Sequence, residues 1–423
     1  MPWSKWYSIK SYIKSSLWIA PFVALLLYLI TIRLLDWLES RMASDFLWPW
    51  GLSGAQTILG TIVTLALSFI VFTFGSLLVA IQVASGQLTP RIIATALLRD
   101  NVIRATVGLF IFTLLFSVGV LGRLEAQAPY IEVGIAGILG FCAIIAFLYL
   151  IDHSARLLRP VSIMRRIGDQ GLRVIEEVYP DRFDGSDAHA SVNRTLGSPD
   201  RSIVHRGWSG IVLAVNLNAL MKQAKQADVI IELIPRVGDF LGSGEALFGI
   251  YGDAAKIDES GLIHNVAFGP ERTIEQDSTF AFRIIVDIGI KALSKAINDP
   301  TTAVLSIDQL QRLLRKVGTR RLHGDEITDG SGHLRLIFRT PDWNDFVQLA
   351  IREIRHYGAE HFQVARRLRS MIESLMRTLP PERHPALAAE LSLLDAAIKE
   401  LYPLPGDLML ASVPDPQGLG AAS

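Results

Sequence analysis

The sequence has little charge in its first third and almost no cysteine anywhere. Residues 1–151 contain fifteen Lys, Arg, Asp and Glu side chains, and the other sixty-seven follow. The stretch from Phe46 to Pro90 has no charged residue in forty-five positions. Soluble domains have roughly 25% charged residues. The uneven distribution therefore predicts a membrane half followed by a water-soluble half.

Several function classes are excluded by what is missing. A single cysteine, Cys142, permits neither an intrachain disulfide nor a cysteine metal site. The even balance of 41 basic and 41 acidic residues gives no indication of a nucleic-acid partner. No phosphate loop occurs, and the glycines of the turn at 235–244 do not form a dinucleotide fingerprint. The run HYGAEH at 356–361 has three residues where the inverted zinc motif has two. We therefore predict no cofactor, no metal and no enzyme activity.

Four apolar segments are predicted to span the membrane as helices, at 17–35, 58–85, 103–122 and 131–151. Ten basic residues flank one side of these segments and three flank the other, which predicts that both termini are cytoplasmic. The absence of a cleavage site after the first apolar run favours an anchor over a removed signal peptide. The chain is therefore predicted to be a multi-pass protein located in the inner membrane.

The second span has a small and hydroxylated stripe at helical spacing. Its members are Thr57, Thr61, Thr64, Ser68, Gly75 and Gln82. None of the four spans has a charge at its centre, whereas ion-coupled carriers usually have one. A pore lined by hydroxyl groups at an oligomer axis needs no such charge. Such hydroxyl stripes more often serve helix–helix packing. The three-residue spacing of Gly134, Gly137 and Gly140 in the fourth span likewise lets another backbone come close.

The junction after the second span is predicted to lie at the cytoplasmic surface. Its distinctive residues are Ser85, Pro90, Arg91, Arg99 and Asp100. Pro90 breaks the helix because it has no backbone N–H and biases the preceding residue out of the helical region. Residues 91–100 then form a short amphipathic segment along the membrane surface.

The predicted fold is an α-helical membrane domain followed by a cytoplasmic α+β domain that contains a small β-barrel-sandwich-like module and C-terminal helices. Its six parts are an interfacial N-terminal segment (1–16), a four-helix transmembrane domain (17–151), an amphipathic helix and linker (152–202), a small β module (203–252), an α+β and helical domain (253–402) and a flexible tail (403–423). Arg366, Arg367 and Arg369 are predicted to form a solvated or membrane-facing surface.

A polar motif lies in the C-terminal half. Arg283, Asp287, Lys291 and Lys295 follow at four-residue steps, a charged ladder that a solvated helix face explains. Asp299 fits an N-cap and Pro300 the first turn of a helix that ends at Gly318. The alternative is a ligand site in which Asp277, Asn298, Asp299, Thr301 and Thr302 surround an exposed helix N-terminus.

Two blocks of the chain resemble the prokaryotic membrane family known as domain of unknown function 2254. The first block contains Gln82, Ser85, Pro90, Arg91, Arg99, Asp100 and residues 108–110. The second contains Gln276, Asp277, Phe280, Arg283, Asp287, residues 292–294 and residues 296–303. Lys295 stands where proline is usual in the family, and Ala281 where glycine is usual. The resemblance implies an inner-membrane location and no established activity.

Two functions remain open at this point. The first is a homo-oligomeric pore or channel-like protein with a cytoplasmic regulatory domain, which passes an ion or small solute through the lipid bilayer. The second is a membrane-anchored cytoplasmic module that binds a ligand or serves as a scaffold without transport.

Overall fold

The computed structural model describes residues 3–4, 6, 19–39, 51–87, 100–124, 130–157, 159–185, 197–322, 324 and 326–420. The chain forms two compact units. The membrane unit consists of residues 13–86 and 90–162, and the C-terminal unit consists of residues 1–12, 87–89 and 163–423. The boundary at 162 lies beyond the predicted boundary at 151, because helix α6 (Tyr130–Leu157) continues past its apolar part.

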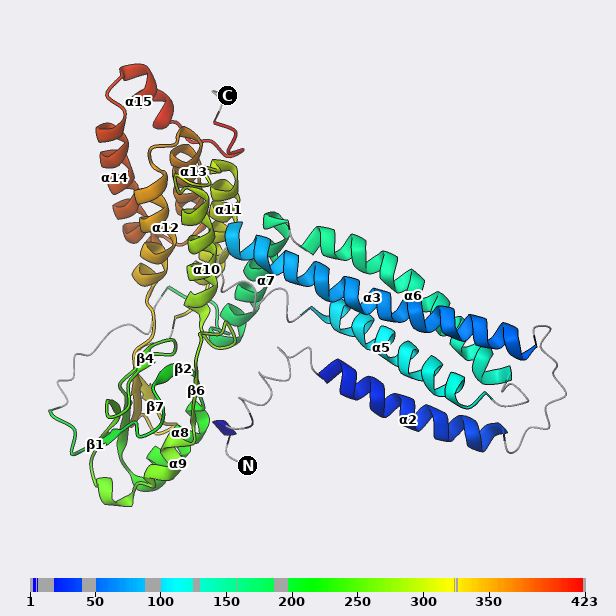
Figure 1. Ribbon diagram of the computed structural model, residues 1–423. Helices are drawn as coiled ribbons and strands as arrows, with labels where there is room; N and C mark the ends of the chain where they lie inside the picture. Colours follow the sequence, from blue (N-terminus) through cyan, green and yellow to red (C-terminus); the bar gives the residue numbers. More distant parts are fainter. Residues whose placement is uncertain are drawn as a thin grey trace. The chain divides into compact units, whose positions relative to one another are not determined.

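The membrane unit contains helices α2 (Ile19–Glu39), α3 (Leu52–Gln87), α5 (Asn101–Gly122) and α6 (Figure 1). Three of them are long and apolar enough to cross a bilayer, over Leu52–Gln82, Asn101–Gly122 and Ile131–Arg156. The apolar part of α2, Ala20–Leu35, is shorter. The prediction is thus confirmed for three spans, and a crossing by the first segment stays a prediction. Helix α3 has 36 residues and measures about 54 Å, well above the roughly 30 Å of a bilayer core.

Two apolar clusters hold the helices of the membrane unit together. One joins Leu59 and Ile62 of α3 to Phe116 of α5 and Ala136 of α6. The other contains Phe69, Phe110 and Phe147, and the rings of Phe69 and Phe147 stack at a centroid distance of 4.1 Å. Of the three predicted contact glycines in α6, Gly140 admits another helix: a Cβ there would lie 2.9 Å from Cγ1 of Ile62.

Helix α2 packs on α5 through a glycine notch. A Cβ on Gly119 would lie 2.1 Å from the hydroxyl oxygen of Tyr28, so only glycine leaves room for that ring. Ala24 of α2 is also buried. The contact shows that α2 belongs to the bundle even though its apolar part is short.

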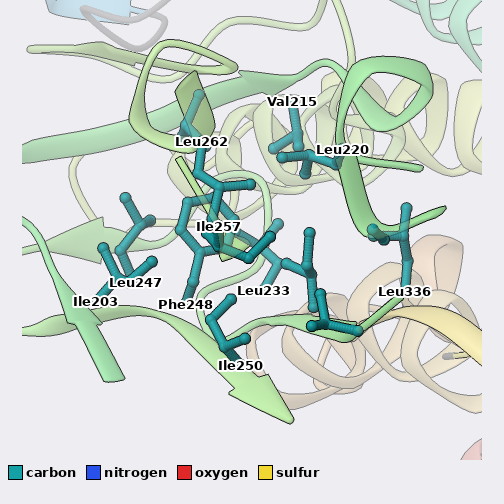
Figure 2. Packing of buried hydrophobic residues seen from close by; sticks show 14 of the residues in the cluster. Ile203, Val215, Leu220, Leu233, Leu247, Phe248, Ile250, Ile257, Leu262 and Leu336 are labelled. Atoms are coloured by element: carbon teal, nitrogen blue, oxygen red, sulfur yellow. The ribbon is translucent and has the colours of Figure 1, made fainter. Parts of the chain in front are cut away.

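The C-terminal unit contains two β-sheets. The larger has the order β1 (Arg201–Val204), β5 (Ala246–Tyr251), β3 (Ile230–Leu233), β8 (Leu334–Phe338) and β7 (Glu326–Thr328). The smaller has the order β4 (Phe240–Leu241), β2 (Gly210–Val215) and β6 (Val266–Gly269). Helices α8 (Leu217–Ala227) and α9 (Glu259–Ile263) contribute to the same core, in which Phe248, Leu262 and Leu336 are buried (Figure 2).

The sheets differ from the small module predicted at 203–252. Strand β6 pairs with β2, and β8 pairs with β3 in parallel with Ile231 opposite Leu336. These partners come from outside 203–252, and β8 lies about a hundred residues along the chain from β3. The β region is therefore assembled from distant segments, as parallel pairing requires a long connection.

The remaining helices pack together: α7 (Pro160–Val178), α10 (Ser278–Ala292), α11 (Pro300–Gly318), α12 (Trp343–Gly358), α13 (Phe362–Thr378), α14 (His384–Leu401) and α15 (Pro405–Ala411). Short 3-10 turns lie at Ala254–Lys256 and Pro381–Arg383. The amphipathic helix predicted within residues 152–202 corresponds to α7. Its Gly171 allows close packing, since a Cβ there would lie 2.7 Å from Cβ of Ala281.

The segment 403–423, predicted to be a flexible tail, is structured as far as residue 420. Helix α15 is followed by a turn in which the Asp415 carboxylate accepts hydrogen bonds from the backbone N–H groups of Gln417, Gly418 and Gly420, at 2.9, 2.9 and 2.7 Å. The backbone N–H of Asp415 itself donates to the carbonyl of Arg366 in α13, and this hydrogen bond attaches the turn to that helix. The tail is thus part of the C-terminal unit.

The prediction of a solvated arginine surface on α13 is wrong. Arg366 is fully buried and Arg367 is 7% exposed. The Nε of Arg366 donates to the carbonyl of Val413 at 3.0 Å, and Arg367 pairs with Asp308 at 2.7 Å. Their partners belong to the tail and to α11, which the local charge pattern does not reveal.

The predicted interfacial segment at 1–16 lies outside the described residues except for Trp3, Ser4 and Trp6. Trp3 packs against Leu213 and Ala267 of the smaller sheet. The backbone N–H of Ser4 donates to the carbonyl of His264 at 3.3 Å. Trp3 therefore contacts protein, and the interfacial position of the segment stays a prediction.

Candidate functional site

The polar stripe of α3 lies on the exposed face of that helix. Its six residues, Thr57, Thr61, Thr64, Ser68, Gly75 and Gln82, are all exposed. The residues that α3 buries are on the opposite face of the helix: Ala55, Leu59, Ile62, Ala66, Thr73 and Ala80. A Cβ on Gly75 would meet nothing within 4 Å. Among the residues that the structure describes, the stripe is therefore not used for packing inside the chain.

Each hydroxyl group of the stripe donates to a backbone carbonyl one turn earlier in α3. The distances are 2.9 Å for Thr57, 2.8 Å for Thr61, 2.9 Å for Thr64 and 2.8 Å for Ser68. A hydroxyl group has one donor and two acceptor positions. Because the donor is engaged, the stripe presents mainly oxygen acceptors to its surroundings.

Helix α5 has the opposite arrangement, with its hydroxyl groups inside the bundle. Thr113 and Ser117 are fully buried one helical turn apart. Among the described residues, neither side-chain oxygen has a hydrogen-bond partner. The sequence analysis considered the hydroxyl residues of the second span and not those of the third, so these two residues were not predicted.

Charged groups lie at the two ends of α5 and α6. At one end Arg123 donates to both carboxylate oxygens of Glu132, at 2.8 and 2.9 Å, and Glu132 is 1% exposed. At the other end the carboxylate of Asp100 accepts from the backbone N–H groups of Val102 and Ile103 and lies 3.1 Å from Nε2 of His153. Asp100 was predicted as a junction residue, whereas its partner His153 was not.

Of the other predicted junction residues, Ser85 lies in α3, and nothing is described of its side chain. Pro90, Arg91 and Arg99 lie outside the described residues. Asp100 acts as the N-cap of α5.

In the C-terminal unit, Asp277 is a buried N-cap. Its carboxylate accepts from the backbone N–H groups of Thr279 and Phe280 at 3.1 Å each and from Nε of Arg272 at 2.9 Å. Gly238 approaches this pair so closely that a Cβ would lie 2.6 Å from the carboxylate. Asp277 thus joins the start of α10 to the turn before β4.

The neighbouring residue Gln276 makes a second link of the same kind. Its side-chain oxygen accepts from the backbone N–H of Val215 at 3.1 Å. Close to the start of α10, burial raises the pKa of Tyr179 to about 12, with a smaller opposing effect from the Ser278 hydroxyl. These contacts explain the family-like residues here by structure alone.

Arg283 is at the centre of an ion-pair group. Its Nε donates to Asp287 at 2.7 Å, and its guanidinium pairs with Glu353 of α12. Burial opposes the charged form of Arg283, but the two carboxylates outweigh it and raise its pKa, while Arg283 lowers the pKa of Glu353. The predicted charged ladder is therefore in part an inter-helix contact between α10 and α12.

Asp299 is the N-cap of α11, as predicted, and Pro300 is the first residue of that helix. The carboxylate of Asp299 accepts from the backbone N–H of Thr302 at 3.1 Å and from its hydroxyl at 2.6 Å. Asn298 has φ of +50°, a left-handed conformation that asparagine tolerates better than most residues. Asn298 and Thr301 are exposed.

Asp277 and Asp299 do not meet at one site. Asp277 precedes the first residue of α10, and Asp299 follows its last turn. The 15 residues of α10 separate them by about 22 Å. The predicted ligand site around both carboxylates therefore resolves into two separate helix caps. Among the described residues, no group of three or more His, Cys, Asp and Glu side chains could hold a metal ion.

A cavity in the C-terminal unit was not predicted from the sequence. It has a volume of about 660 Å³ and lies at the carboxyl ends of α11 and α13. Its lining residues are Arg182, Phe183, Lys316, Thr319, Arg320, Arg377, Thr378, Leu379 and Pro380. Four of these nine residues are cationic and none is acidic. We call it the basic cleft.

Comparison with known proteins gives one family. The model of the family described as predicted membrane protein, domain of unknown function 2254 (DUF2254), matches residues 14–374. Uncharacterised proteins of Mycobacterium bovis and Mycobacterium tuberculosis are each 25% identical to the chain over 413 residues, which cover 93% of this chain and 78% of theirs. No solved structure matches the chain.

Proposed function

The chain belongs to the predicted membrane protein family known as domain of unknown function 2254, and we propose that it is a homo-oligomeric pore or channel-like protein. In this proposal the α3 helices of several copies surround a passage for an ion or small polar solute. The C-terminal unit is cytoplasmic and regulates the passage. No catalytic step is part of the proposal.

The observation that supports a pore is the exposure of the α3 stripe. A polar stripe that packs inside its own chain would be buried, and this one is exposed along its whole length. Its possible neighbours are lipid and a second copy of the chain. Lipid tails offer no hydrogen-bond partner to four hydroxyl groups and a glutamine. Membrane helices, in contrast, associate through small and polar residues.

The chemistry of the stripe favours cations or water over anions. The hydroxyl protons of Thr57, Thr61, Thr64 and Ser68 are engaged by the helix backbone. The oxygen lone pairs that remain can replace part of the hydration shell of a cation, as rings of oxygen ligands do in cation-selective filters. An anion would find few donors on this face.

The topology proposed with this function has both termini in the cytoplasm of a cell with an inner membrane. It requires α2 to cross as a fourth span, with Arg33, Arg41 and Arg123 on the outer side. The notch that places Tyr28 of α2 against Gly119 of α5 supports a crossing, because it aligns α2 with a helix that is long enough to span.

Site-directed cross-linking tests the oligomer. The chain has one cysteine, so Cys142→Ser gives a cysteine-free background. In that background we expect Ser68→Cys to form disulfide-linked dimers in membranes. Leu67→Cys is the matched control, at the same depth and also exposed, but about 100° away around the helix. Equal cross-linking at both positions, or at neither, would contradict a stripe-to-stripe contact.

Ion flux into liposomes tests the passage itself. Purified protein should conduct a monovalent cation, and Thr64→Leu, which places an apolar side chain in the stripe, should reduce the flux by at least about tenfold. Leu67→Ala, outside the stripe, should leave it unchanged. If the purified protein forms oligomers but conducts no cation, the proposed oligomer stands and the proposed pore is contradicted.

A second candidate is a membrane-anchored module that binds a ligand without transport. The observation in its favour is the basic cleft, which lies entirely within the C-terminal unit. Binding in this cleft and flux through the membrane are separate measurements, so the two candidates can be told apart.

A further inference from the structure

The basic cleft has the geometry of a prepared site. The backbone of Arg182 bridges to that of Arg320. Beside this bridge the N–H of Phe183 donates to the carbonyl of Thr319 at 3.0 Å, and the N–H of Arg321 donates to that of Asp181 at 3.0 Å. The loop that bears Arg182 is therefore pinned to the end of α11, and its side chain starts from a fixed backbone.

The favourable effect of helix carboxyl ends on nearby cations explains only some of the cations that line the basic cleft. Cations near a helix carboxyl end interact favourably with its dipole, and Lys316, Arg320 and Arg377 lie near the ends of α11 and α13. The carbonyl groups there already have other partners, however. The buried Arg383 donates to the carbonyls of Gly318 and Arg320, at 3.3 and 3.0 Å. Arg182 lies on no helix.

The charges of the cleft are only partly neutralised. Glu176 of α7 pairs with Lys316 and lies 3.5 Å from Arg320, and the Lys316 contact holds the pKa of Glu176 below its ordinary value. Arg320 also donates to the carbonyl of Pro180 at 2.7 Å. The guanidinium groups of Arg182 and Arg377 form no hydrogen bond or ion pair with any described residue. Two engaged and two unengaged cations thus surround one cavity.

The floor of the cleft adds a further charge. The guanidinium of Arg383 lies 4.4 Å from the ring centroid of Phe183, which lines the cleft. Arg383 is 2% exposed, so its charge is little screened by water. Thr319 and Thr378 supply hydroxyl oxygens at the rim.

We propose that the basic cleft binds a small molecule with at least two phosphate groups, held by Arg182 and Arg377 together with Lys316 and Arg320. The planar guanidinium fork matches two oxygens of a phosphate, and lysine adds a point charge. A volume of about 660 Å³ is within the range of small-molecule sites and admits a ligand of nucleotide size. The ligand can be a soluble diphosphate or the phosphorylated headgroup of a lipid. The assignment does not depend on the pore.

Pyrophosphate binding to the full-length protein in neutral phosphatidylcholine nanodiscs is the first test. Isothermal titration calorimetry should show saturable binding to the wild type, and Arg182→Gln with Arg377→Gln should weaken it by at least about tenfold, as expected for the loss of charge-assisted contacts. Lys222→Gln with Lys225→Gln removes two exposed cations from α8, outside the cleft, and should leave affinity unchanged. Equal losses in both pairs of variants would overturn the proposal.

The second arm distinguishes the source of the phosphate. If a lipid headgroup fills the cleft, pyrophosphate should bind weakly, and nanodiscs containing cardiolipin, whose headgroup has two phosphates, should raise the unfolding temperature of the wild type more than that of the Arg182/Arg377 variant. If the double variant fails to fold, Arg377→Gln alone replaces it, because Arg377 is exposed. No difference between wild type and variant in either arm would overturn the site.

Discussion

The two units of the protein place their charged groups differently. In the membrane unit the described contacts between ionisable side chains lie at helix ends, as Arg123 with Glu132 and Asp100 with His153. In the C-terminal unit the side chains of Arg366 and Arg383 are inside the core. Between its charged ends the membrane unit buries only hydroxyl groups among its polar side chains, within the described residues.

The difference has a physical cause. A helix bundle in lipid satisfies its own backbone, so it offers few free carbonyl groups to a buried cation. The C-terminal unit has helix ends and loops inside its core. Their carbonyls accept from Arg366 and Arg383, and the aromatic rings of Phe183 and Trp343 lie against the Arg383 guanidinium. A buried arginine is therefore tolerated where helix ends and loops bring free carbonyl groups together inside the core.

The largest expected effect is the removal of such an arginine. Arg366→Ala deletes the donor to the Val413 carbonyl and the cation beside Asp415, so we expect it to destabilise the C-terminal unit by about 3–5 kcal/mol. Thermal unfolding in detergent and proteolysis of the tail measure the loss. Arg206→Ala is the control, because its side chain is 76% exposed, and a change within about 0.5 kcal/mol is expected there. A mild effect at Arg366 would mean that the core relaxes around the missing charge.

Within the membrane unit, two glycines should respond in opposite ways. Gly119→Ala places a Cβ against the Tyr28 hydroxyl and should cost about 1–3 kcal/mol by overpacking. Tyr28→Phe in the same chain should restore part of the loss, since it removes the contacted oxygen. Gly75→Ala meets open space in one chain and should be neutral or stabilise by up to about 1 kcal/mol. Unfolding temperatures in detergent compare the three, and equal losses at both glycines would refute the notch.

The smallest effect concerns pH and separates the units again. Burial alone would raise the pKa of Asp415, but the N–H groups of residues 417, 418 and 420, together with Arg366, outweigh it and lower the pKa. A lowered carboxyl pKa adds stability above the ordinary value of about 3.9, and this is lost as pH falls below about 4. As the pH is lowered through this range, the backbone amides of residues 417–420 should lose their protection from hydrogen exchange before the amides of α5 do. Asp415→Asn should show fast exchange already at neutral pH.

Local patterns predicted much of the fold. The third span was predicted at 103–122 and is observed at 101–122, because an apolar run of bilayer length has few alternatives. Asp299 and Pro300 begin α11 and Gly318 ends it, as their capping preferences indicate. The membrane half and the α+β half follow from charge and periodicity in the same way.

The site depended on contacts that local patterns do not contain. Asp277 and Asp299 were grouped by residue type, and the length of α10 separates them. The basic cleft combines residues 182, 316–320 and 377–380, three segments that only packing of α7, α11 and α13 brings together. Charge pattern placed Arg366 on the surface because its partners lie far along the chain.

Hydrophobicity and helical period are properties of consecutive residues, so they were enough to predict the membrane half, the position of its helices and the regular polar stripe on one of them. The exposure of this stripe and the burial of the α5 hydroxyl groups became clear from the packing of the helices. The packing also shows which arginines are engaged and which line a cleft. These outcomes depend on which face each helix presents to its neighbours, and that choice is made by side chains distant in the chain.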